Sequence, residues 1–320
     1  MKKIFIAFAA LAAFAACNKA EVVDVTPDNL IGFDAPFVDN ATKALGEKDY
    51  SGSKALTGFK VYGTVTGNSA TVNLFDGVQI NRNEKGFGVA WDYADETDKQ
   101  YWLPSCSYSF AAVVDGTVAE KDANGMPTEL SYKVGDGDLL YATVTATTNE
   151  SGVPTGVNSN NCVAFTFDHL ISKVYFTFVN GFDSDAYQYK VNEVTISGFA
   201  AEGTYTIEDE EWDLGDETTE NPLSFGTPGV LAKGATVTSD TDHLIIPGTQ
   251  TVTINFTYDV IFKGEAISRM TVSKTLTDQV FAQETVYNIN VTLPALGNEI
   301  QFTVTNVPGG FATAGGDINI

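Results

Sequence analysis

The chain has 320 residues, of which 41 are acidic and 18 basic, so its formal net charge at pH 7 is −23. A surface this acidic repels nucleic-acid phosphates and anionic lipid headgroups, which excludes nucleic-acid binding. With 43% hydrophobic residues the chain is too apolar to be disordered. Its length exceeds what one hydrophobic core usually serves, so two domains are expected.

The N-terminus has the pattern of a secretory signal peptide. Two lysines precede an uncharged apolar run, residues 4–16, that ends at Cys17. The run is too short to cross a bilayer of about 30 Å as a helix, and the pattern predicts cleavage after residues 1–16. Ala15-Ala16-Cys17 resembles a bacterial lipobox, in which the Cys thiol is acylated. An ordinary secretory signal, with Cys17 there by chance, is the alternative.

The next segment alternates as a β-strand does. Ile31, Phe33 and Phe37 are separated by small or polar residues, which predicts a strand that turns these three side chains into the core of a first domain. Pro36 cannot donate a ladder hydrogen bond, so the strand is expected at a sheet edge. Residues 39–44 are polar and include Lys43, a composition typical of a protease site.

Period-two alternation dominates the rest of the chain. Residues 251–262 alternate strictly between apolar and polar side chains, which indicates a long half-buried strand. Similar runs occupy residues 59–65, 70–75, 108–114, 139–146, 163–167, 173–178, 191–196, 286–293 and 300–307. No segment after the signal holds a helical stripe for three turns. The sequence therefore predicts an all-β protein built of sandwiches.

A polar, Gly-rich stretch, residues 149–161, is the best candidate for a linker. We place the domain boundary near residue 158, with an uncertainty of about ten residues. The expected organisation is a lipidated propeptide at 17–43 that carries the N-terminal strand, an N-terminal β-sandwich at 44–158 and a C-terminal β-sandwich at 159–320.

No convergent set of catalytic or metal-binding residues is visible. His169 and His243 lie in apolar surroundings and are expected to be structural. Cys106 and Cys162 either pair in the oxidising compartment or remain separate thiols, because nothing in the sequence fixes their distance. We expect no enzyme activity, no metal site and no cofactor.

Two further features have a structural and a functional interpretation. The acidic run 208–213 lacks the spacing of a calcium loop, so a solvated hairpin loop is the preferred interpretation. Trp91, Trp102 and Trp212 could form a sugar-stacking platform, but scattered Trp residues in sandwiches are usually part of the core.

Several of these elements, taken in chain order, resemble the fimbrillin family of pilin precursors. The resemblance rests on the following residues and runs: Cys17, Ile31-Gly32-Phe33, Thr42-Lys43-Ala44, residues 56–63, Tyr101-Trp102-Leu103-Pro104, residues 108–110 and 138–142, Phe167-Asp168-His169-Leu170, residues 171–174 and Ile245-Ile246-Pro247-Gly248. Each motif is weak alone, and their ordered occurrence over nearly the whole chain carries the resemblance.

The resemblance implies two tandem transthyretin-like β-sandwich domains after a lipoprotein signal peptide. It implies a precursor held at the outer membrane by acylated Cys17 and cut by a processing protease between Lys43 and Ala44. Such proteases of the family require Arg, so Lys43 implies a lysine-tolerant protease or no processing. Removal of the strand with Ile31, Phe33 and Phe37 would then allow strand exchange with other pilin subunits in a fimbrium at the cell surface.

The donor strand in this scheme could be the C-terminal segment that begins near Phe302, although that segment could equally be the last strand of its own domain. Host-surface ligands would be further partners of a pilus that supports adhesion. The alternative function is a lipid-anchored surface protein that binds host glycan or protein and never polymerises.

The lipid anchor gives a direct test. Because the acyl chains would be attached through the Cys17 sulfur, Cys17→Ala should leave the protein unlipidated and release it from the membrane fraction. Partition into detergent, followed by immunoblotting, measures this. Unchanged partition of the variant into the detergent phase would rule the lipoprotein out.

Overall fold

The computed structural model describes residues 29–38, 56–68, 70–85, 88–219, 221–294 and 299–307. Cys17, Lys43 and Ala44 lie outside the described residues. Within this part of the chain nearly all regular structure is β, with one three-residue 3-10 turn, η2 (Glu96–Asp98). No helix in the described ranges is long and apolar enough to span a membrane. The all-β prediction is confirmed.

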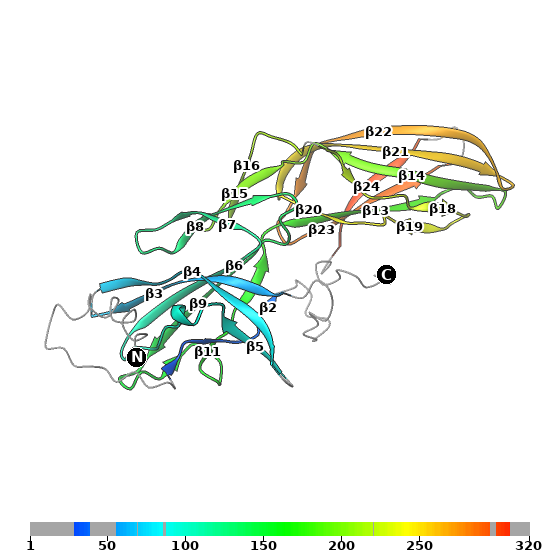
Figure 1. Ribbon diagram of the computed structural model, residues 1–320. Coiled ribbons are helices and arrows are strands. Elements are labelled where there is room, and N and C mark those ends of the chain that lie inside the picture. The colour runs from blue at the N-terminus through cyan, green and yellow to red at the C-terminus, as the bar shows by residue number, and fades with distance from the viewer. Residues whose placement is uncertain are drawn as a thin grey trace.

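The first half of the chain forms one ten-stranded sheet (Figure 1). Its strands are paired in the order β11-β1-β5-β4-β3-β6-β9-β12-β2, with β10 paired to β9. The long strands are β3 (Gly58–Gly67), β4 (Ala70–Lys85), β5 (Gly88–Tyr93), β6 (Ser107–Val114) and β9 (Leu140–Thr148). The short ones are β1 (Gly32–Phe33), β2 (Phe37–Val38), β10 (Pro154–Thr155), β11 (Cys162–Val163) and β12 (Thr166–His169).

Strands β11 and β12 follow the boundary predicted near residue 158, yet they belong to the first sheet. Val163, Phe165 and Phe167 are buried in the first hydrophobic core together with Phe59 and Phe75. The chain passes into the strands of the second half only after His169. The polar stretch predicted as a linker therefore leads back into the first sheet.

The second half is a sandwich of two five-stranded sheets. One sheet contains β13 (Ser172–Asn180), β19 (Thr236–Thr238), β20 (His243–Ile245), β23 (Val286–Leu293) and β24 (Gln301–Val307). The other contains β14 (Tyr187–Ser197), β17 (Leu223–Ser224), β18 (Gly229–Leu231), β21 (Gly248–Phe262) and β22 (Glu265–Phe281). The predicted alternation of β21 is confirmed, because its apolar residues from Val252 to Val260 all lie in the second core.

A fourth sheet joins the two halves (Figure 1). It contains β7 (Thr117–Lys121) and β8 (Pro127–Lys133) from the first half, and β15 (Glu202–Thr206) and β16 (Glu211–Leu214) from the second. Strand β8 pairs with β15 along its length. Leu130 and Tyr132 of β8 pack with Tyr205 and Ile246 in a core of their own. The halves are thus held together by backbone hydrogen bonds as well as by side-chain packing.

Asp259 shows how a polar position on the outer face of β21 becomes buried. Arg269 on the neighbouring β22 donates from Nε to Asp259 Oδ1 at 2.6 Å and from Nη2 to Oδ2 at 2.9 Å. Asn192 adds a third donor at 3.3 Å, and Asp259 is only 8% exposed. The hydrogen bonds from Arg269 outweigh the desolvation of the carboxylate and lower the pKa of Asp259 to about 2.

This lowered pKa predicts a pH dependence. The Asp259 carboxylate stabilises the fold above its ordinary pKa near 3.8, and this contribution is lost as the pH falls toward about 2. Asp259→Asn should therefore reduce the free energy of unfolding at pH 6 and change it much less at pH 2. Urea unfolding at both pH values measures the difference. Equal effects of the substitution at pH 6 and pH 2 would contradict the assignment.

Candidate functional site

The N-terminal segment 29–38, which we call the closing strand, is held on one side by β5 and the residues that follow it. Ile31 N–H donates to the Gln100 carbonyl at 2.9 Å, and Trp102 N–H donates to the Asn29 carbonyl at 2.8 Å. Further along, Phe33 lies opposite Trp91 in an antiparallel pair. This edge of the sheet therefore runs antiparallel to the closing strand.

The other side of the closing strand is paired in parallel with β11 and β12. Gly32 and Phe33 lie opposite Cys162 and Val163, and β2 lies beside the start of β12. Asp34 N–H donates to the Val163 carbonyl at 3.0 Å, and Phe37 N–H donates to the Phe165 carbonyl at 2.9 Å. One segment thus pairs with both ends of the ten-stranded sheet and closes it.

Phe33 lies at the centre of an aromatic cluster. Its ring centroid is 5.5 Å from that of Tyr93, 6.0 Å from Phe75, 6.1 Å from Phe59 and 6.2 Å from Phe165. The partners come from strands β3, β4 and β5 and from the segment between β11 and β12. Burial of an aromatic ring among such partners contributes both apolar area and edge-to-face contacts. Removal of this ring would leave a cavity that four aromatic side chains line.

Ile31 is fully buried and is fixed through its backbone as well. The Tyr93 hydroxyl donates to the Ile31 carbonyl at 2.7 Å. Burial raises the pKa of Tyr93 far above its ordinary value, which favours the protonated phenol that donates this bond. This bond could not be predicted from the sequence, because Tyr93 lies 62 residues away along the chain.

The prediction that Phe37 points into the core is wrong. Phe37 is 50% exposed, whereas Phe33 and Val38 are each 5% exposed. Pro36 is buried and lies in the break between β1 and β2, so the alternation of inward and outward side chains does not continue across it. The inward residues are therefore Ile31, Phe33 and Val38. Pro36 could have indicated this shift from the sequence alone, because a proline interrupts the hydrogen-bond ladder of a strand.

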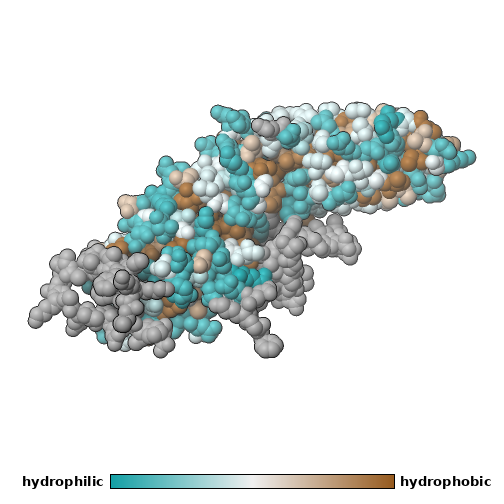
Figure 2. Space-filling model, viewed as in Figure 1, coloured by the Kyte–Doolittle hydropathy of each residue, from teal (hydrophilic) through white to brown (hydrophobic). Residues whose placement is uncertain are grey.

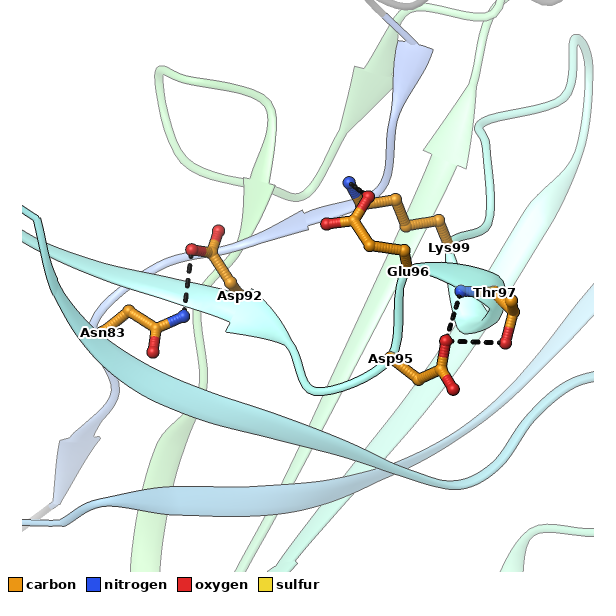
Figure 3. Close-up of polar contacts among 6 residues, drawn as sticks. All are labelled: Asn83, Asp92, Asp95, Glu96, Thr97 and Lys99. Carbon is orange, nitrogen blue, oxygen red and sulfur yellow. Dashed lines mark hydrogen bonds and ion pairs between the residues drawn. The ribbon is translucent and has the colours of Figure 1, made fainter. Parts of the chain in front are cut away.

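A short turn holds the antiparallel edge in place (Figure 3). Asp95 Oδ1 accepts hydrogen bonds from the backbone N–H and the hydroxyl of Thr97, both at 2.8 Å, at the start of η2. Lys99 Nζ lies 2.5 Å from a carboxylate oxygen of Glu96. The turn leads directly into Gln100, which accepts the Ile31 bond. Its capping interactions thus fix the strand against which the closing strand pairs.

The parallel side has a tight fit at Gly32. A Cβ atom there would lie 2.9 Å from the Cys162 sulfur, closer than real Cβ contacts allow, so a larger residue would require the Cys162 side chain or the closing strand to shift. Asp34 and Asn158 form a side-chain hydrogen bond across the same seam, 2.5 Å long. Cys162 and Cys106 are both free thiols.

The other candidate residues have structural contacts. His169 is buried, and its Nδ1 lies 2.9 Å from an Asp138 carboxylate oxygen. His243 Nε2 lies 2.7 Å from the Ser224 carbonyl oxygen. These polar partners agree with the structural role predicted for both side chains.

Trp91 and Trp102 are buried in the first core, and Trp212 packs beside the core at the joint, where its indole N–H donates to the Leu170 carbonyl at 2.9 Å. These positions confirm the core interpretation. The acidic run lies in the turn of the β15–β16 hairpin and at the start of β16, so the predicted hairpin loop is confirmed. Within the described residues no group of three or more His, Cys, Asp or Glu side chains could hold a metal ion.

These features define an all-β sandwich protein whose first sheet is closed by its own N-terminal segment. The family model described as fimbrillin-like matches residues 42–306. The chain therefore belongs to the fimbrillin-like family, as its motifs predicted.

Solved structures show the same fold. A fimbrial protein from Bacteroides vulgatus superimposes with a TM-score of 0.63 at 14% identity, over 88% of this chain and 99% of that one. A candidate cell adhesion protein from Bacteroides ovatus gives a TM-score of 0.51 at 17% identity, over 87% and 95% of the two chains. No curated protein sequence matches.

The contrast between Phe33 and Phe37 gives a matched test of the closing strand. Phe33→Ala removes the centre of the aromatic cluster and should lower the free energy of unfolding by about 3–5 kcal/mol. Phe37→Ala, in the same segment but exposed, should change it by no more than about 0.5 kcal/mol. Urea unfolding followed by tryptophan fluorescence measures both. Equal effects would mean that the closing strand is not part of the first core.

Proposed function

We propose that this protein is a structural subunit of a cell-surface pilus, polymerised by strand exchange after its closing strand is removed. The observation that carries the proposal is that residues 29–38 pair with both ends of the first sheet. These residues also precede Lys43 and Ala44, the predicted cleavage site. A cut there would separate the closing strand from the rest of the chain.

The closing strand contributes a large share of the stability of the first half. Burial of Ile31, Phe33 and Val38 at about 1.5–3 kcal/mol each amounts to roughly 5–9 kcal/mol. A domain is typically stable by only about 5–15 kcal/mol. A first half that lost this strand would therefore gain much of its stability back by binding another strand in the same place.

Covalent attachment explains why the precursor would not polymerise prematurely. While residues 29–38 remain attached, they occupy their place at a high effective concentration, and a strand from another subunit cannot compete. After cleavage this advantage is lost. An extended segment that alternates apolar and polar residues could then pair with β5 on one side and with β11 and β12 on the other, a form of strand addition.

We propose the C-terminal segment as the donor. Strand β24 lies at an edge of its sheet and pairs only with β23 among the described strands. Phe302 and Val304 are half-buried against the second core, so fewer apolar contacts hold β24 than hold the central strands. The alternative, that β24 is simply the last strand of its own sandwich, is the state that the structure describes.

The proposed route to the surface is export as a lipoprotein through acylated Cys17, with the precursor held at the outer membrane until a processing protease cuts after Lys43. Other copies of the subunit, outer-membrane lipid, that protease and host-surface ligands are then the partners, and the function is structural and adhesive rather than enzymatic. The runner-up function is a lipid-anchored surface protein that binds host glycan or protein without polymerising.

The test is controlled removal of the closing strand. A recognition sequence for a sequence-specific protease, placed at residues 39–43, allows the cut without digestion at other lysines. The cut protein should lose stability by several kcal/mol and form filaments that electron microscopy detects, whereas the uncut protein should remain monomeric. An excess of a synthetic peptide of residues 29–38 should suppress assembly, and the same peptide with Phe33→Glu should not.

Two outcomes would contradict the proposal. If the cut protein remains an equally stable monomer at high concentration, strand exchange at this place is wrong. If surface protein from cells retains the intact N-terminal segment, as mass spectrometry of the N-terminus would show, the non-polymerising binder becomes the better account.

A further inference from the structure

Strand β22 is an edge strand of unusual length. It spans 17 residues and pairs with β21 on one side and with no other described strand. The other strands at sheet edges among the described residues are much shorter: β24 has seven residues, β7 five, β16 four, β18, β19 and β20 three each, and β10 and β17 two each. Proteins usually keep exposed edges short or cover them, because a long free edge is a template for pairing.

The edge is also uncovered and partly apolar. Thirteen of the 17 residues of β22 are exposed. Ile267 is 53% and Met270 45% exposed. In Figure 1 the strand follows the outer rim of the second half, where Figure 2 shows pale and teal atoms with brown ones between them.

Its charge differs from that of the rest of the chain. The strand carries Glu265, Arg269, Lys274 and Asp278, two residues of each sign, whereas the whole chain has a net charge of −23. Two copies of so acidic a protein repel each other over most of their surface. The repulsion is weakest where the local charge is balanced, and β22 is the longest edge strand among the described residues that carries no net charge.

We propose that β22 pairs antiparallel with β22 of a second copy of this chain, about a two-fold axis through Ser273. An axis perpendicular to the sheet keeps the outer faces of the two copies on one side and their core faces on the other. Thr271 then lies opposite Thr275 of the second copy, and Met270 lies opposite Leu276. The half-exposed apolar side chains of the core face thereby cover each other.

The charges agree with this register. Arg269 faces Thr277 of the second copy, next to Asp278, and Lys274 faces Val272, so no like charges lie directly opposite each other. An axis shifted by one residue to Lys274 would place two lysines directly opposite each other, which is destabilising. The contact would join copies through β22, a different part of the molecule from the place of strand exchange proposed for the closing strand.

A cysteine at the axis tests the pairing. Residues directly opposite in an antiparallel pair have Cα atoms about 4.5–5.5 Å apart, which a disulfide can bridge. In the mature chain with Cys17→Ala, Ser273→Cys should therefore form a covalent dimer under mild oxidation. Ser268→Cys is the matched control, exposed on the same strand. Its two copies would lie about 33 Å apart and should not crosslink.

A pair of introduced positive charges gives a second, independent readout. Thr271→Lys combined with Thr275→Lys places like charges opposite each other and should weaken dimerisation at least about tenfold in sedimentation equilibrium. Thr236→Lys with Thr238→Lys adds the same charge to β19, where both residues are exposed, and should leave the dimer unchanged. A chain that stays monomeric at high concentration, or equal crosslinking at 268 and 273, overturns the proposal. Filament formation after removal of the closing strand would be unaffected by that result.

Discussion

The structure of the first half depends on one strand being shared by two sheet edges. Residues 29–38 pair antiparallel with β5 and the turn after it, and parallel with β11 and β12. Phe33 fills the space between them, in contact with four aromatic rings. A strand at a free edge can detach when the hydrogen bonds of one ladder break. The closing strand can detach only if the hydrogen bonds on both of its sides break and the core behind it opens.

The closing strand also bears on how the two halves are joined. Its partner β12 is the last strand before the chain enters the second half, and the residues that follow, Leu170 and Ile171, lie in the core of the joint. That joint contains a sheet made by β8 and β15, one from each half. The first half therefore cannot lose its closing strand without loosening a strand next to the joint.

Much of this arrangement could be predicted from the sequence, because it follows from local alternation. The period-two pattern of β21, and the inward direction of Ile31 and Phe33, needed only the residues themselves. The pattern failed at Phe37, because buried Pro36 shifts the alternation, and Val38 takes the inward position. It also could not reveal that β11 and β12 return to the first sheet or that β8 pairs with β15, since both pairings join residues far apart in the chain. The burial of the Asp259 carboxylate could not be predicted either, because it depends on Arg269 of the neighbouring strand.

Amide hydrogen exchange of the uncut protein tests the central claim most directly. The amides of Ile31, Asp34 and Phe37 donate to Gln100, Val163 and Phe165, one on the antiparallel side of the closing strand and two on the parallel side. If this strand closes the sheet, these three amides should exchange as slowly as those of β3 and β6, because they open only when the first half unfolds. If these amides exchange at the rate of an unstructured segment while those of β3 and β6 stay protected, the first sheet remains folded without the closing strand. That result would contradict the account.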